Sequence, residues 1–149
     1  MVSYYASRPS NDIVTAAWQK VTHDWWEKRA NDFEIYISQY VLDEISSGDA
    51  DAAAQRLDLV KGFKQLQTEE EIMVLAESLL EKHSLPQKAR MDAIHLAVSA
   101  VHGIDFLLTW NCRHLANAAL WDSMANVCHD HDFAMPIICT PQELIEGTK

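Results

Sequence analysis

The sequence predicts an α/β fold in which a parallel sheet is flanked by helices. Three short runs have the composition of strands, at 33–37, 105–109 and 136–139, and stretches with helical spacing of apolar residues separate them. Strands joined through helices usually pair in parallel. With 149 residues, 48% of them apolar and 23% charged, the chain is expected to form a single domain over residues 1–149.

The first long helix is expected to follow Ser10, a residue type that caps helix N-termini. Its apolar face consists of residues at helical spacing, namely Val14, Trp18, Val21 and Trp25. Trp26 cannot share that narrow face with Trp25, so one of the two is expected to reach the surface, where it would suit self-association or a partner peptide.

The next elements alternate between strand and helix. The run 33–37 alternates as a strand does, and Ser38 is expected to cap a helix that ends near Gly48. A further helix is expected over 50–60, with Gly62 as its stop.

Capping boxes mark two helices in the second half of the chain. Thr68 with Glu71 is expected to start the first helix. Ser84 with Gln87 is expected to start the second, which reaches about His102.

The remaining elements complete the predicted sheet. The run 105–109 is expected to be a buried strand, followed by a helical stretch after Asn111 and a short last strand at 136–139. The terminal helix is expected to be capped by Thr140, Pro141 and Glu143.

Charge and cysteine content narrow the class of protein. There are 12 basic and 22 acidic residues, so the chain lacks the basic footprint of a protein that coats nucleic acid. An acidic balance is compatible with a metal nuclease, whose site is built of carboxylates. An odd number of cysteines, with no visible signal peptide or membrane segment, predicts thiols in the cytoplasm.

Asp92 is the most unusual residue, because it lies in a helix that is apolar on nearly every face. A buried carboxylate must be hydrogen-bonded, paired or bound to a metal. The alternative is a local bond to Ser99 or to a backbone amide. Glu44 and Asn111 each follow a predicted strand closely, where open parallel sheets bind ligands, although Glu44 alone is typical of a solvated helix and Asn111 of a cap.

Three segments carry these residues, with the sequences SQYVLDEI (38–45), MDAIHLA (91–97) and DFLLTWN (105–111). In order and spacing they resemble the PIN domain, the nuclease fold of many bacterial toxin–antitoxin toxins, and the resemblance covers nearly the whole chain. It implies a metal-dependent endoribonuclease that uses Mg²⁺ or Mn²⁺, forms a homodimer and is held by an antitoxin protein.

The resemblance also assigns roles to particular residues. It makes Glu44 and Asp92 metal-site carboxylates and places Asn111 at a position that is usually acidic. Hard divalent cations prefer oxygen ligands, and such an ion would activate water and offset charge on the phosphate. Thr109 is expected to hydrogen-bond within the same cluster.

The N-terminus departs from the family pattern. A PIN domain begins with a central strand that ends in an acidic ligand, whereas no carboxylate precedes Asp12 here. We therefore expect the first strand to be missing, and catalysis to depend on an upstream segment. The alternative function is a degenerate PIN domain that binds protein or RNA without cutting it. A more distant alternative is a small α/β enzyme with other metal chemistry.

Other candidate residues carry weaker expectations. His95 and His114 lie near the proposed cluster, although core histidines are usually structural. Residues 128–132 are rich in metal-ligand types but match no standard zinc spacing. Cys112 is expected to be a small buried residue. Local RNA contacts, or simple solubility, are the expected roles of Lys28, Arg29, Lys88, Arg90 and Arg113.

Overall fold

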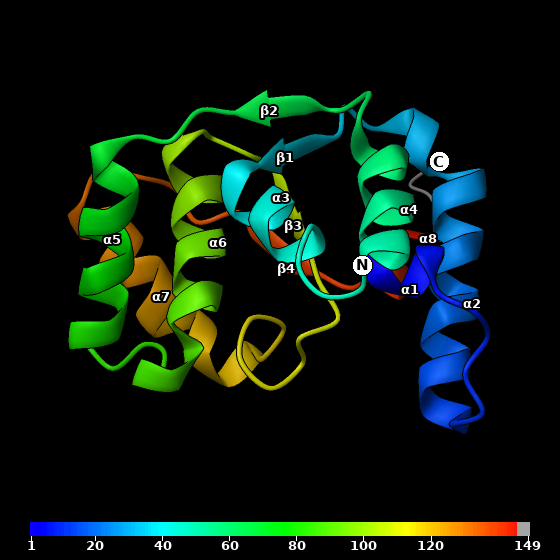
Figure 1. Cartoon of the computed structure of the whole chain (residues 1–149). Helices are drawn as coiled ribbons and strands as arrows, with labels where there is room; N and C mark the ends of the chain where they lie inside the picture. The colour runs from blue at the N-terminus through cyan, green and yellow to red at the C-terminus, as the bar shows by residue number, and fades with distance from the viewer. Residues whose placement is uncertain (146–149) are drawn as a thin grey trace. The chain divides into compact units, whose positions relative to one another are not determined.

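The computed structural model describes residues 1–145, which form an α/β structure with two small parallel sheets. The chain divides into two compact units, coloured along the sequence in Figure 1. Unit 1 contains Met1–Leu66 and the C-terminal stretch from Thr140, and unit 2 contains Gln67–Cys139. The α/β class is thus confirmed, whereas the PIN-like arrangement and the single domain stay predictions.

Unit 1 contains five helices and one two-stranded sheet among its described residues. They are α1 (Val2–Ala6), α2 (Ile13–Lys28), the short 3-10 turn η1 (Ala30–Asp32), β1 (Tyr36–Ser38), α3 (Gln39–Ile45), α4 (Ala50–Val60), β2 (Lys64–Leu66) and α8 (Pro141–Ile145). Strand β1 pairs in parallel with β2, so that Ile37 lies opposite Gln65. The strand β2 was not expected from the sequence, because its polar residues lack the β-branched and aromatic side chains that favour strands.

An aliphatic core holds the sheet of unit 1 to its helices. Ile37 of β1, Ile45 of α3 and Val60 of α4 are buried together. The helix α1 packs against α2 and α4, and its Tyr5 ring stacks on Trp26 with a centroid distance of 4.8 Å. Residues 2–6 are therefore helical, and no strand precedes residue 8 in the part of the chain that the structure describes.

The start of the long helix differs from the expectation for Ser10. Asp12 is the N-cap of α2, and its carboxylate accepts from the Thr15 amide at 2.8 Å. Ser10 instead accepts from the Asp12 amide. The first turn of α2 extends past the helices that pack on it, so Val14 is 56% exposed and lies outside the core (Figure 1).

The buried face of α2 consists of Gln19, Thr22 and Trp25, and Trp25 is only 4% exposed. Trp26 is half-buried, so the two tryptophans do separate in exposure, as expected from their adjacency.

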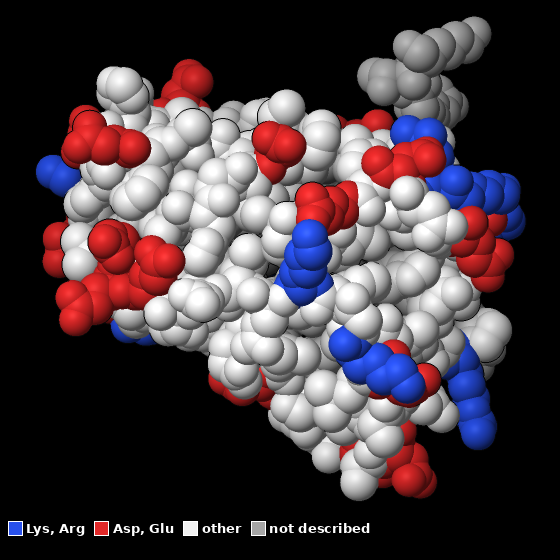
Figure 2. Space-filling model, turned by 90° about the horizontal axis from the view of Figure 1, so that it is seen from above, with Lys and Arg blue, Asp and Glu red and all other residues white. Residues whose placement is uncertain are grey.

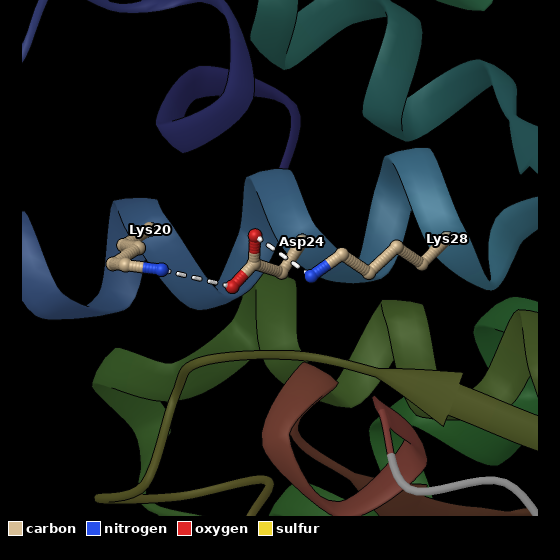
Figure 3. Close-up of polar contacts among 3 residues, drawn as sticks. All are labelled: Lys20, Asp24 and Lys28. Atoms are coloured by element: carbon tan, nitrogen blue, oxygen red, sulfur yellow. Dashed lines mark hydrogen bonds and ion pairs between the residues drawn. The ribbon is translucent and has the colours of Figure 1, made fainter.

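The outer face of α2 carries a shared ion pair. The Asp24 carboxylate lies 3.2 Å from Lys20 Nζ and 3.6 Å from Lys28 Nζ, one turn before and one turn after it (Figure 3). The hydrogen bond from Lys20, more than the charge of either lysine, holds the pKa of Asp24 below its usual value. Exposed pairs of this kind contribute little to stability, since water screens them.

Unit 2 consists of three long helices and a second parallel sheet. Its elements are α5 (Glu70–Glu81), the 3-10 turn η2 (Gln87–Ala89), α6 (Arg90–Val101), β3 (Phe106–Leu108), α7 (Ala118–Asp130) and β4 (Ile137–Cys139). Helix α5 packs on α6 and on α7 (Figure 1). As the periodicity predicts, Ile72, Leu75 and Leu79 form its fully buried face.

The sheet of unit 2 pairs β3 with β4 in parallel, with Leu107 opposite Ile138. The expectation of a buried strand at 105–109 is only partly met, because Phe106 is exposed and Leu107 and Leu108 are half-buried. A two-stranded sheet covers its strands less completely than a larger one.

Several predicted caps are wrong. Helix α5 begins at Glu70 with no side-chain cap from Thr68. Helix α6 begins at Arg90 rather than after Ser84, because Pro86 disfavours a helical Leu85. Ser84 is buried and its Oγ lies 2.6 Å from that of Ser123.

Other boundaries agree with the sequence. Helix α4 spans the expected residues, and the Ser38 side chain accepts from the Val41 amide at the start of α3. At the start of α8, the Glu143 carboxylate accepts from both the amide and the hydroxyl of Thr140. No helix in residues 1–145 has the length and apolar character that a membrane crossing requires.

Candidate functional site

The N-terminal end of α6 positions Asp92. Most other residues of this helix are buried, including Ala93, Ile94 and Leu96, so the helix is anchored firmly in unit 2. Asp92 lies in the first turn and is half-buried rather than fully buried. Its location at the rim of the core leaves it in reach of the segment that follows β3.

Asn111 reaches Asp92 from that segment. The Nδ2 atom of Asn111 donates to Oδ2 of Asp92 at 2.8 Å. This bond joins two of the three motifs that the sequence singled out, although 19 positions separate the residues. Ser99, the alternative local partner of Asp92, instead donates its hydroxyl to the carbonyl of His95.

Asn111 also organises the turn in which it lies. Its backbone N–H donates to Thr109 Oγ1 at 3.0 Å, and its backbone carbonyl accepts from the Ala116 N–H at 2.7 Å. Its side-chain Oδ1 accepts from the backbone N–H of His114 at 3.0 Å. Asn side chains commonly hold turns in this way. The helical stretch expected after Asn111 is α7, but it begins only at Ala118: residues 112–116 form turns, and Asn117 caps the helix.

The two side-chain contacts of Asn111 select one orientation of its amide. A backbone N–H can only donate, and an ionised carboxylate can only accept. The oxygen must therefore face His114 and the NH₂ group must face Asp92. In this arrangement the amide oxygen, the atom that would bind a metal, already accepts a hydrogen bond.

Glu44 belongs to the other unit. It is exposed near the end of α3 and lies in electrostatic range of the Met1 amino group. Burial lowers the pKa of that amino group, and the negative charge of Glu44 opposes the shift. The structure thus brings together Asp92, Asn111 and Thr109 within unit 2, and describes Glu44 in unit 1.

The cluster of unit 2 offers a cation one carboxylate. Mg²⁺ commonly keeps several waters and uses only one or two carboxylates, so Asp92 fits such an ion, whereas Asn111 in its observed orientation does not add a ligand. Among residues 1–145, no three His, Cys, Asp or Glu side chains are grouped as a metal site would need.

The remaining candidate residues are those of the segment 128–132 and Cys112. His131 lies 2.9 Å from Ser78 Oγ, and Cys128 is buried in α7. Cys112 is exposed, so the expectation that it is buried is wrong. It lies in the turn between Asn111 and α7. The backbone amide of His114 was also missed, although an Asn three residues before it is a recognisable turn signal.

Comparisons with protein-family models, with curated proteins and with solved structures found no match to this chain.

Proposed function

We propose that this chain is a PIN-type, metal-dependent endoribonuclease domain in which Asp92 is a metal-site carboxylate. The supporting observation is the 2.8 Å hydrogen bond that joins Asp92 to Asn111 and so brings the second and third motifs into one cluster. A half-buried carboxylate held by a side chain from another element is pre-organised in the way that a metal site requires.

Each residue of the cluster has a role in this proposal. Asp92 holds Mg²⁺ or Mn²⁺, and Asn111 holds the carboxylate in position. The Thr109 hydroxyl accepts from the backbone N–H of Asn111 and so fixes the turn. When bound, the cation would supply activation of water and stabilisation of charge on the phosphate. The roles of a toxin, a cognate antitoxin and a homodimer rest on the family resemblance alone.

Over residues 1–145, the surface of the chain offers few unpaired basic side chains for binding RNA. Of the five residues considered for RNA contacts, three are paired with carboxylates: Lys28 with Asp24, Arg29 with Asp32 and Arg90 with Glu77. Figure 2 shows basic side chains interspersed with acidic ones on the face that it presents. With a net charge of −10, affinity for RNA depends on the bound cation and on few basic residues.

The test is cleavage of RNA in the presence of Mg²⁺ or Mn²⁺. We expect Asp92→Asn to lower the rate by roughly 100-fold or more, since several kcal/mol of transition-state stabilisation depend on the ion. Asp122→Asn makes the same chemical change at an exposed position of α7 and should cleave as the wild type does. Equal rates for the two variants, or cleavage that persists in EDTA, would contradict the proposal. Glu44→Gln tests the role that the resemblance implies for Glu44.

A non-catalytic binding module is the second candidate. The observation that favours it is that the Asn111 side-chain amide already donates to Asp92 without a cation. On this reading the wild type binds RNA or a protein partner and does not cleave. Retained RNA binding with no cleavage in either metal would select this candidate over the nuclease.

A further inference from the structure

The contact between Asp92 and Asn111 joins a carboxylate to a neutral side-chain amide. One carboxylate carries the negative charge and one neutral amide donates to it at 2.8 Å. The same amide accepts from the His114 backbone at 3.0 Å, so both ends of the side chain are engaged. A hydrogen bond to an ionised acceptor is stronger than one between neutral groups.

We propose that Asn111 is a positioning residue that takes the place of a cation beside Asp92 and holds the site in shape without metal. This inference builds on the proposed function, because it concerns the carboxylate that the proposal assigns to the metal. The link ties the start of α6 to the turn after β3.

A comparison with aspartate at position 111 shows why the side-chain amide matters. An aspartate at position 111 would still accept from the His114 amide. Its other oxygen would replace Nδ2 and face Asp92 Oδ2 at close to the same separation. Two ionised carboxylates in such contact repel, and the pair needs a proton or a cation between them. The neutral amide removes that need.

The experiment is thermal unfolding of the full chain in EDTA and in millimolar Mn²⁺ or Mg²⁺. We expect the Tm of the wild type to change by less than about 1 °C between these conditions. Asn111→Asp should lower the Tm in EDTA by roughly 5 °C, and the divalent cation should restore most of it.

A charge-swapped double variant is the matched control. Asp92→Asn combined with Asn111→Asp again pairs one amide with one carboxylate, and the aspartate still accepts from the His114 amide. We expect this variant to regain stability in EDTA. If Asn111→Asp is too unstable to purify, the double variant decides: folding in EDTA supports the inference, and failure to fold contradicts it.

Other outcomes separate this inference from the proposed function. A wild type that loses stability in EDTA, or an Asn111→Asp variant as stable as the wild type in EDTA, would overturn the role of Asn111. Neither result depends on RNA cleavage. Conversely, a chain that cleaves no RNA but shows the expected Tm pattern keeps the positioning role and loses the nuclease assignment.

Discussion

Cys128 and Cys112 show how strongly position determines the chemistry of one residue type. Cys128 is completely buried in α7, and burial raises the pKa of its thiol to about 11. Cys112 is exposed in the turn after Asn111. Because the thiolate is the reactive form, both the burial of Cys128 and its raised pKa protect it from reaction.

We expect one of the three thiols, that of Cys112, to react quickly with a disulfide reagent at pH 8 in the native protein. Cys112→Ser should remove the fast phase, whereas Cys128→Ser should leave it unchanged, and all three thiols should react in denaturant. Two fast thiols in the native protein would contradict the burial of Cys128 and Cys139.

The raised pKa of Cys128 also affects stability. The unfolded chain loses this proton near the usual pKa of 9.0, and the folded chain only near 11. The contribution of the buried thiol is thus fully present below pH 9 and declines as the pH rises toward 11.

At the level of elements, α5 and α6 end in the same backbone motif with different residues. The amide of Ser84 donates to the Leu79 carbonyl at the end of α5, and that of Ile104 donates to the Ser99 carbonyl at the end of α6. In each motif the residue just before the donating amide has a left-handed backbone. This residue is His83, with φ 58°, after α5 and Gly103, with φ 64°, after α6. Glycine adopts this conformation without the strain that a side chain introduces.

We expect His83→Gly to raise the free energy of unfolding by roughly 0.5–1 kcal/mol, because it relieves backbone strain at an exposed site. Gly103→Ala should lower it by about 1 kcal/mol, although the added Cβ would meet no crowding from residues beyond its neighbours in the chain. Chemical denaturation measures both. If His83→Gly destabilises the protein, the imidazole makes a contribution that outweighs the strain.

At the level of the whole molecule, each unit has a two-stranded sheet in the part of the chain that the structure describes. Such a sheet is marginal by itself and depends on the helices that cover it. Units of about 75 residues also bury a smaller share of their surface than larger domains do. These two properties favour cooperative unfolding of the chain, in line with the predicted single domain.

We therefore expect one unfolding transition. Trp18, Trp25 and Trp26 lie in unit 1, and Trp110 and Trp121 lie in unit 2. In a Trp110→Phe/Trp121→Phe variant, fluorescence reports on unit 1 and far-UV circular dichroism on both units. Their midpoints in denaturant should coincide, and separated midpoints would mean that the units unfold as independent domains.

Local signals in the sequence predicted much of the fold. Apolar spacing located the buried face of α5, and Ser38 and the Thr140–Glu143 pair were recognised as caps because such bonds span only three residues. The errors arose where distant contacts override local preference. Ser84 pairs with Ser123 instead of capping a helix, and the polar strand β2 exists because β1 pairs with it.

The sequence by itself determined the α/β class, the positions of most helices and the suspicion that Asp92 needs a partner, since these follow from spacing and from the cost of burying a carboxylate. Only the tertiary structure decided which partner that is. The Asn111 amide meets Asp92 because α6 and the turn after β3 are brought together within unit 2, and the His114 backbone N–H then dictates which end of the amide faces the carboxylate. Hydrogen-bond direction depends on atoms that chain packing brings together, and no local pattern in the sequence encodes it.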